Sequence, residues 1–196
     1  MGVKAIVFDY IGVLVRSFDE FHTELSKISG KNETKIREYF KKHWQPLKVG
    51  KITDTEFWNR MRRDLKISSD DVKRAKRFVL NLLKVEKETL KNIRKLWKDY
   101  DLYLLSNSCY GWSEISFNNN GLRPYFRKIF FSHRLGLAKP DRKIYVHTLN
   151  EINLPPNEIL FVDDSSKNIA TAEKIGFEAI KFQNWSGLFK RLEKIK

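Results

Sequence analysis

The chain has 196 residues, 41% of them hydrophobic, and a formal net charge of +14. This length and apolar content predict one domain with its own core, or one domain with a modest insertion. No apolar run approaches the roughly 18 residues that span a bilayer, and the N-terminus lacks a signal-peptide layout, so we expect a soluble cytoplasmic protein without membrane contact.

The single Cys109 excludes an internal disulfide and a cysteine-based zinc cluster. Basic residues alternate with Glu and Asp along the whole chain instead of gathering in one tail. This pattern is typical of a lysine-rich solvated surface, so nucleic acid is not expected as the main partner. The positive charge also suits a small anionic substrate.

The first predicted element is a short buried strand, Ala5 to Phe8, which ends at Asp9 and a glycine-containing turn. Residues 16–84 show no convincing strand pattern. Apolar side chains there recur at helical spacing, and Thr53 to Glu56 offers a capping-box start. We expect residues 16–84 to form a helical insertion in a core made of residues 1–15 and 85–196.

From residue 86 onward, helices alternate with short apolar strands. The predicted strands cover residues 102–105, 128–131, 159–162 and 179–182, and the helices cover residues 88–98, 112–119, 143–152, a segment through Ala172 and the C-terminal segment. Such alternation predicts parallel strands joined by right-handed crossovers. The expected fold is therefore α/β, a Rossmann-like doubly wound parallel sheet.

Polar side chains follow three of these strands where each one ends. Asp9 follows the first, Ser106 the second, and Asp163 with Asp164 a later one. Polar residues after strands often only cap the next helix. The carboxyl ends of parallel strands meet at one edge of a sheet, however, so all of these groups are expected to share one crevice.

Lys139 and Pro140 close a loop that starts with a Leu-Gly pair at residues 135–136. A lysine in such a loop can bring a positive charge to an anion. With the strand-end residues it completes the parts needed for phosphoryl transfer: an attacking carboxylate, donors for the phosphoryl oxygens, an ammonium that neutralises charge, and carboxylates that hold Mg²⁺.

These segments resemble the four motifs of the haloacid dehalogenase-like hydrolase superfamily, in order and over nearly the whole chain. The matching segments are Phe8-Asp9 through Leu14, Leu104 to Asn107, Lys139-Pro140, and Phe161 to Asp164 with Asn168. The insertion, with Gly50-Lys51-Ile52, resembles the helical cap of the family. The chain is similar to the branch that holds glucose-1-phosphate phosphatases and the N-terminal phosphatase-like halves of epoxide hydrolases.

The resemblance implies a Mg²⁺-dependent phosphatase of small phosphorylated metabolites that acts through an aspartyl-phosphate at the nucleophile Asp9. The implied catalytic residues are Asp9, Ser106 and Lys139, the phosphate-binding residues Ser106, Asn107 and Lys139, the metal ligands Asp9, Asp164 and the backbone carbonyl of Ile11, and the supporting residues Asp163 and Asn168. We also expect the cap to open and close over the site and to exclude water.

The first motif departs from the common phosphatase pattern at Ile11. In that common pattern an Asp stands at this position, protonates the leaving alkoxide and then activates water, although the branch that this chain resembles includes members with a small residue there. Ile11 can do neither, although its carbonyl still suits a metal ion. Acyl or anomeric phosphates would need this acid least, and His22 or His43 of the cap is a candidate to replace it.

Two other functions stay open. A 2-haloacid dehalogenase would attack carbon with Asp9 and would need neither metal nor acid, but Asp163 and Asp164 would place negative charge beside an anionic substrate. A non-catalytic binding protein on the same scaffold would explain the lost acid, although every other motif residue is present. Substrate identity and oligomeric state do not follow from the sequence.

Overall fold

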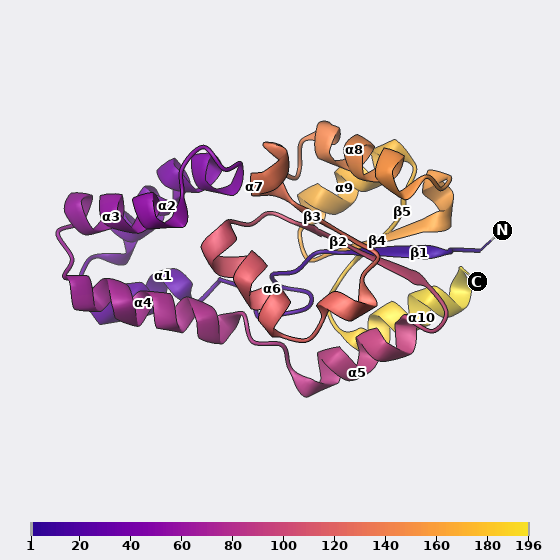
Figure 1. The fold of residues 1–196 in the computed structure, drawn as a ribbon, viewed down its shortest axis with the longest axis horizontal. Coiled ribbons are helices and arrows are strands. Elements are labelled where there is room, and N and C mark those ends of the chain that lie inside the picture. Colours follow the sequence, from indigo (N-terminus) through magenta and orange to yellow (C-terminus); the bar gives the residue numbers. More distant parts are fainter. Residues whose placement is uncertain (1, 196) are drawn as a thin grey trace.

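Five parallel strands form the central sheet of the computed structural model, which describes residues 2–195 (Figure 1). The strands are β1 (Ala5–Phe8), β2 (Asp101–Ser106), β3 (Lys128–Phe131), β4 (Ile159–Asp163) and β5 (Glu178–Lys181). Their order in the sheet is β3-β2-β1-β4-β5, so the chain builds outward from β1 in both directions. Every neighbouring pair is parallel, which confirms the predicted doubly wound α/β fold.

Helices cover both faces of the sheet. They are α5 (Lys87–Leu96), α6 (Ile115–Asn119) and α10 (Trp185–Lys194) on one face, and α8 (Arg142–Ile152) and α9 (Ser166–Ile175) on the other. Within β1, Ile6 and Phe8 pack in the first hydrophobic cluster, whereas Ala5 and Val7 pack in the second. Because successive side chains of a strand point to opposite faces, β1 is apolar throughout and buried on both sides.

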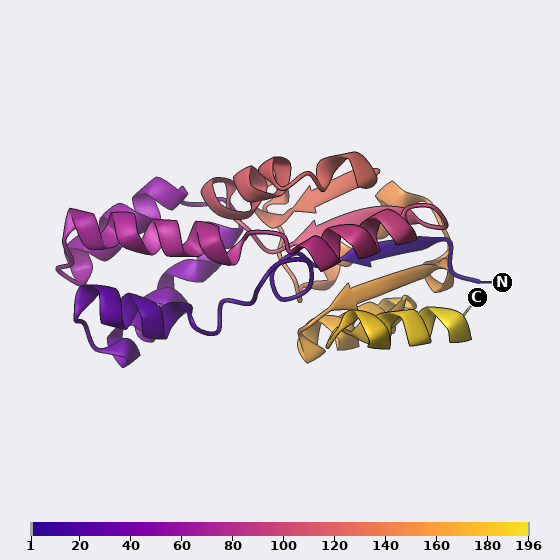
Figure 2. The ribbon, with the colours of Figure 1, turned by 90° about the horizontal axis from the view of Figure 1, so that it is seen from below.

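Four further helices lie between β1 and α5 and extend beyond the carboxyl ends of the strands (Figures 1 and 2). We call these helices the cap: α1 (Phe21–Ser29), α2 (Glu33–Lys48), α3 (Asp54–Asp64) and α4 (Ser69–Leu82). The predicted capping box starts α3, since the Thr53 Oγ1 accepts a hydrogen bond from the Glu56 N–H at 3.1 Å and the Glu56 carboxylate accepts one from the Thr53 N–H at 2.8 Å.

The two connections between cap and core run side by side. The Arg16 N–H, before α1, donates a hydrogen bond to the Leu82 carbonyl, at the end of α4, over 3.2 Å. We propose domain boundaries of residues 1–15 and 85–196 for the core and 16–84 for the cap; the terminal residues 1 and 196 lie outside the described part. Among residues 2–195, no helix has the length and apolar character needed to cross a membrane.

Short elements depart from the sequence expectation. A single π-helical turn, Tyr110–Glu114, precedes α6 where one helix over residues 112–119 was expected. The short helix α7 (Ser132–Leu135) follows β3 directly, and 3₁₀ turns occupy Arg123–Tyr125 and Pro156–Glu158. The other predicted strands and helices agree with the structure within about two residues, the usual uncertainty of element ends.

The π-helical turn places Trp112 of the core inside the aromatic cluster of the cap. The Trp112 ring lies 5.9 Å from that of Trp44, nearly parallel to it, and 5.7 Å from that of Trp58. Only 3% of Trp112 is exposed, and one continuous hydrophobic cluster runs from Phe8 in the sheet to Phe57 in the cap. Cap and core are therefore joined by buried aromatic packing as well as by their two connections.

Replacing Trp112 by Ala should remove this contact. We expect Trp112→Ala to lower the free energy of unfolding by about 3–5 kcal/mol, the usual cost of truncating a large buried aromatic side chain. Urea unfolding followed by circular dichroism measures the loss. The matched control is Trp97→Ala, because Trp97 is 52% exposed; equal losses in both variants would contradict the packing role of Trp112.

Candidate active site

The carboxyl ends of β1, β2 and β4 bring the predicted strand-end residues together. The register pairs Phe8 of β1 with residue 104 of β2 and residue 162 of β4, so the strands end side by side. Asp9 directly follows β1, while Ser106 and Asp163 are the last residues of β2 and β4. The predicted convergence at one sheet edge is therefore found.

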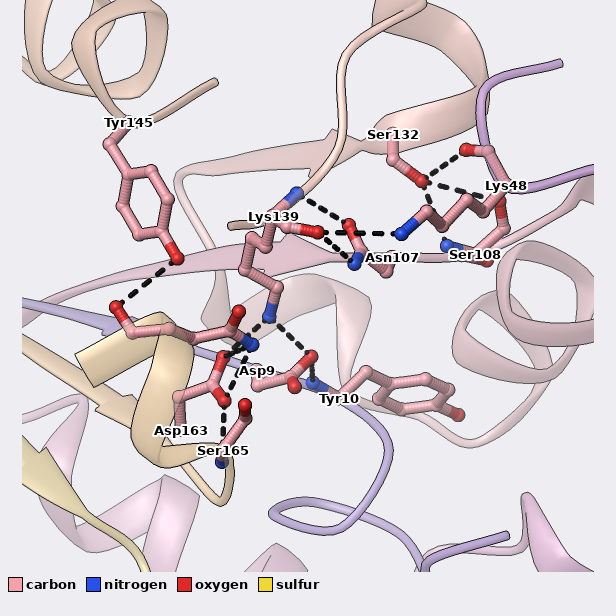
Figure 3. Close-up of polar contacts among 11 residues, drawn as sticks. Asp9, Tyr10, Lys48, Asn107, Ser108, Ser132, Lys139, Tyr145, Asp163 and Ser165 are labelled. Atoms are coloured by element: carbon pink, nitrogen blue, oxygen red, sulfur yellow. Dashed lines mark hydrogen bonds and ion pairs between the residues drawn. The ribbon is translucent and has the colours of Figure 1, made fainter. Parts of the chain in front are cut away.

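Lys139 joins two of these carboxylates (Figure 3). Its Nζ lies 2.9 Å from Asp9 Oδ1 and 2.7 Å from Asp163 Oδ2. Lys139 is 1% exposed and Asp163 is fully buried. The Asn168 Nδ2 donates hydrogen bonds to both oxygens of Asp163, at 2.9 and 3.0 Å, and the Ser165 N–H donates a third at 2.9 Å. Asp163 is thus held in a fixed orientation with its charge compensated.

Asn107 fastens the loop that carries Lys139. The Lys139 N–H donates to Asn107 Oδ1 at 2.9 Å, and the Asn107 Nδ2 donates to the Lys139 carbonyl at 2.8 Å. This reciprocal pair ties the backbone of the loop to the end of β2 (Figure 3). The side chain of Asn107 therefore positions Lys139.

Ser106 is fully buried, and its Oγ has no hydrogen-bond partner within residues 2–195. A buried hydroxyl without a partner is costly, so native proteins rarely leave one without a reason. Its place beside Asp9, at the end of the neighbouring strand, makes Ser106 a suitable donor for a ligand oxygen.

Three carboxylates form a set of oxygen donors. One oxygen each of Asp9, Asp163 and Asp164 lies within 4.8 Å of the others. Gly12 makes room for Asp164: it has a φ of +85°, and a Cβ there would lie 2.1 Å from Asp164 Oδ2. Carboxylate oxygens are the donors that Mg²⁺ prefers, so this cluster fits such an ion.

The carboxylates outnumber the cations at this site. The pKa of Asp9 is raised from 3.8 to about 8: burial is the main cause, Lys139 acts in the opposite direction, and the charge of Asp163 adds to the rise. Burial and Asp163 also raise the pKa of Asp164. For Lys139, burial is outweighed by Asp163 and Asp9, so the pKa of its ammonium is raised. A bound divalent cation would bring the formal charge of the three carboxylates and Lys139 to zero.

A cleft of about 900 Å³ lies between this cluster and the cap. Asp9, Ile11, Asn107 and Asp164 line it on the core side. From the cap side and its connections, the lining residues include Phe18, Asp19, His22, Arg37, Lys41, Trp44 and Gln45. Ser106 and Lys139 lie deeper and are not part of the lining.

Only one of the two cap histidines lines the cleft. His22 lines it, whereas the ring of His43 stacks on that of Tyr39, with centroids 4.3 Å apart, and does not. The Arg37 Nη1 lies 3.4 Å from His22 Nδ1. The sequence pattern alone did not single out Arg37. The available signal was the spacing of residues 37, 41, 44 and 45, which places them on one face of α2.

Residues 3–176 match the model of the haloacid dehalogenase-like hydrolase family. The chain belongs to this family of hydrolases. This match confirms the family predicted from the motifs, and it confirms the predicted enzyme class, a hydrolase.

Individual relatives agree with this assignment. The hydrolase is 31% identical over 194 residues to the D-ribitol-5-phosphate phosphatase of Bacteroides thetaiotaomicron, with 93% of each chain covered. A haloacid dehalogenase family enzyme of the same organism, crystallised with magnesium and inorganic phosphate, superposes with a TM-score of 0.80 at 25% identity, covering 96% of this chain and 100% of that one. The bifunctional epoxide hydrolase 2 of Sus scrofa is 34% identical over 74 residues, 38% of this chain and 13% of that protein.

The pH dependence of stability in the metal-free hydrolase tests the charge arrangement. Since the pKa of Asp9 rises from 3.8 to about 8 on folding, the folded state keeps a proton that the unfolded chain releases. The stability that Asp9 contributes is therefore fully present below pH 3.8 and is lost as the pH rises toward 8. Relative to Asp9→Asn, the wild-type free energy of unfolding should fall with pH across this window, by up to about 1.4 kcal/mol per pH unit.

Urea unfolding in chelator, at pH steps from 4 to 9, measures this difference. Asp70→Asn is the control because its carboxylate is 83% exposed, and its difference from wild type should not change in the same way. A pH-independent difference for Asp9→Asn would show that Asp9 is already ionised in the metal-free protein.

Proposed function

We propose that this hydrolase is a Mg²⁺-dependent phosphatase of small phosphorylated metabolites that acts through an aspartyl-phosphate at Asp9. The observation that carries the proposal is the buried Lys139 ammonium, which lies between Asp9 and Asp163 at the strand ends. The unpartnered hydroxyl of Ser106 and the three-carboxylate cluster support it. So does the similarity to a phosphatase of a phosphorylated polyol.

In the proposed reaction, an Asp9 carboxylate oxygen attacks phosphorus and the bond to the ester oxygen breaks, and the leaving oxygen takes up a proton from solvent water. Lys139 and Ser106 hold the phosphoryl oxygens, the first as a cation and the second as a hydrogen-bond donor. Water then attacks the phosphorus of the aspartyl-phosphate, which releases inorganic phosphate and restores the Asp9 carboxylate.

Asp9, Asp164 and the backbone carbonyl of Ile11 are the proposed ligands of Mg²⁺, with Asp163 and Asn168 as supporting residues. When bound, the ion supplies positive charge that favours ionised carboxylates and offsets the charge of the phosphoryl oxygens. This matters for Asp9, because burial in the metal-free site favours its protonated form, which cannot act as a nucleophile.

The cleft supports a hydroxylated substrate. Arg37, Lys41 and Gln45 offer hydrogen-bond donors along one face of α2, and the ring of Trp44 offers an apolar surface beside them. This combination suits a phosphorylated polyol or sugar. A 2-haloacid fits less well, since its carboxylate would face the acidic cluster around Asp9.

We propose that His22 partly replaces the acid missing at Ile11. The guanidinium of Arg37 can only donate, so its contact with Nδ1 leaves the proton of a neutral His22 ring on Nε2. Burial, followed by the charge of Arg37, lowers the pKa of His22, which also favours the neutral ring. Neutral His22 would then donate a hydrogen bond to the leaving oxygen without giving up its proton.

Substitution of Ile11 tests the phosphatase reaction. A correctly placed carboxylic acid contributes a factor of about 10² to 10⁴, so Ile11→Asp should raise kcat on alkyl phosphates by at least about tenfold, while Ile11→Asn should not. Asp9→Asn should abolish turnover. The assay is release of inorganic phosphate, with Mg²⁺ and with chelator; turnover of 2-haloacids that survives chelation would contradict the proposal.

Substitution of His22 tests the hydrogen bond to the leaving oxygen. His22→Leu should slow hydrolysis of alkyl phosphates about tenfold more than hydrolysis of p-nitrophenyl phosphate, whose leaving group needs little stabilisation. His22→Gln, which keeps an N–H donor, should lose less. His43→Leu is the control outside the cleft. Equal slowing of both substrates by His22→Leu would assign His22 a structural role only.

A further inference from the structure

Lys48 is a buried lysine that the proposed reaction does not use. It ends α2 of the cap, yet it is only 9% exposed. Within residues 2–195, the single hydrogen bond of its ammonium is a long one of 3.5 Å, from Nζ to the Lys139 carbonyl, and no carboxylate oxygen lies within 4.0 Å of Nζ. Figure 3 shows its ammonium pointing at the pair formed by Asn107 and Lys139.

This placement is unfavourable in the ligand-free protein. Burial lowers the pKa of Lys48, and the positive charge of Lys139 lowers it further. A partly desolvated ammonium with one weak acceptor has lost hydration without a counter-charge. Packing alone would be served better by an uncharged side chain of the same length.

The backbone of Lys48 is nevertheless fixed to the core. The Ser132 Oγ donates a hydrogen bond to the Lys48 carbonyl at 2.5 Å and accepts one from the Ser108 N–H at 2.9 Å. Two residues further on, Gly50 passes so close to the core that a Cβ there would lie 2.4 Å from the His133 carbonyl. The loop after β2 and helix α7 after β3 therefore hold the cap at this point.

The charge balance of the site provides a reason for this cation. Asp9, Asp163 and Asp164 face the single ammonium of Lys139, and one divalent ion would neutralise the remainder. A phosphate monoester is largely dianionic at neutral pH, since its second pKa is about 6. Among the described residues, those that line the cleft on the core side include no cation, whereas Lys48 lies beside the loop that holds Lys139.

We propose that Lys48 is a positioning residue through which the cap supplies positive charge to a bound phosphate dianion. It acts through the Lys139 carbonyl and the Asn107 side chain that shares this carbonyl, so phosphate binding also strengthens the contact between cap and core. The proposal rests on the phosphatase function proposed above.

Binding of inorganic phosphate in the presence of Mg²⁺ tests this role. Lys48→Met keeps the length of the side chain and removes its charge. It should weaken phosphate binding about tenfold by titration calorimetry, while the melting temperature without phosphate stays equal or rises, because a buried unpaired charge is removed. Lys48→Gln is a second variant with the same expectation. Lys42→Met, at an exposed lysine of the same helix, should change neither quantity.

A merely structural role gives the opposite result. Lower melting temperatures for both Lys48 variants, with unchanged phosphate affinity, would overturn the proposal. Turnover of phosphate esters by the wild-type enzyme separates the two inferences. If the wild type hydrolyses esters and Lys48→Met binds phosphate equally well, only the role of Lys48 fails; if the wild type neither hydrolyses esters nor binds phosphate, both fail.

Discussion

The ammonium of Lys139, shared by the carboxylates of Asp9 and Asp163, is the interaction on which the site depends. It is buried with both partners, and it connects the ends of β1 and β4 to a loop that arrives from β3. This cation lowers the pKa of Asp9, against the burial and the charge of Asp163 that raise it. Asn107 fixes the loop from the end of β2, so the three central strands all contribute to one charged centre. The apolar sheet beneath this centre lowers the local dielectric constant, which strengthens the interactions between its charges.

Much of this centre follows from the sequence, because parallel topology fixes where strands end. Asp9, Ser106 and Asp163 could be assigned to one sheet edge from three apolar runs and their order alone. Contacts across the cap could not be assigned in this way, because an amphipathic pattern reveals which face of a helix is buried but not which residues pack against it. His22 and His43 look alike in sequence, and only the packing of the cap places the first in the cleft and the second on Tyr39. The π-helical turn at Trp112 has no local signature that separates it from an ordinary helix start.

The charge balance also gives Ile11 a second meaning. A carboxylate at this position would add a fourth negative charge to a cluster that already exceeds its cations. Ile11 removes a proton-transfer group, but it also removes repulsion toward an incoming anion. Any acidic residue there would act on a site where burial already raises the pKa of Asp9 and of Asp164. The same side chain therefore has two consequences: acid catalysis is lost, and repulsion of an anionic substrate is reduced.

The insertion of Trp112 bears on how such a protein can evolve. A cap joined only by two connections could be exchanged between relatives as an independent piece. Here the cap completes its aromatic cluster with a side chain that the core provides, and Gly111 beside it approaches Asp54 of α3 so closely that a Cβ would lie 2.2 Å from the carboxylate. Recombination that replaces the cap would leave Trp112 exposed unless residues 110–114 were replaced as well. Cap and core therefore share one packed cluster, so a change on one side of this contact must be matched by a change on the other.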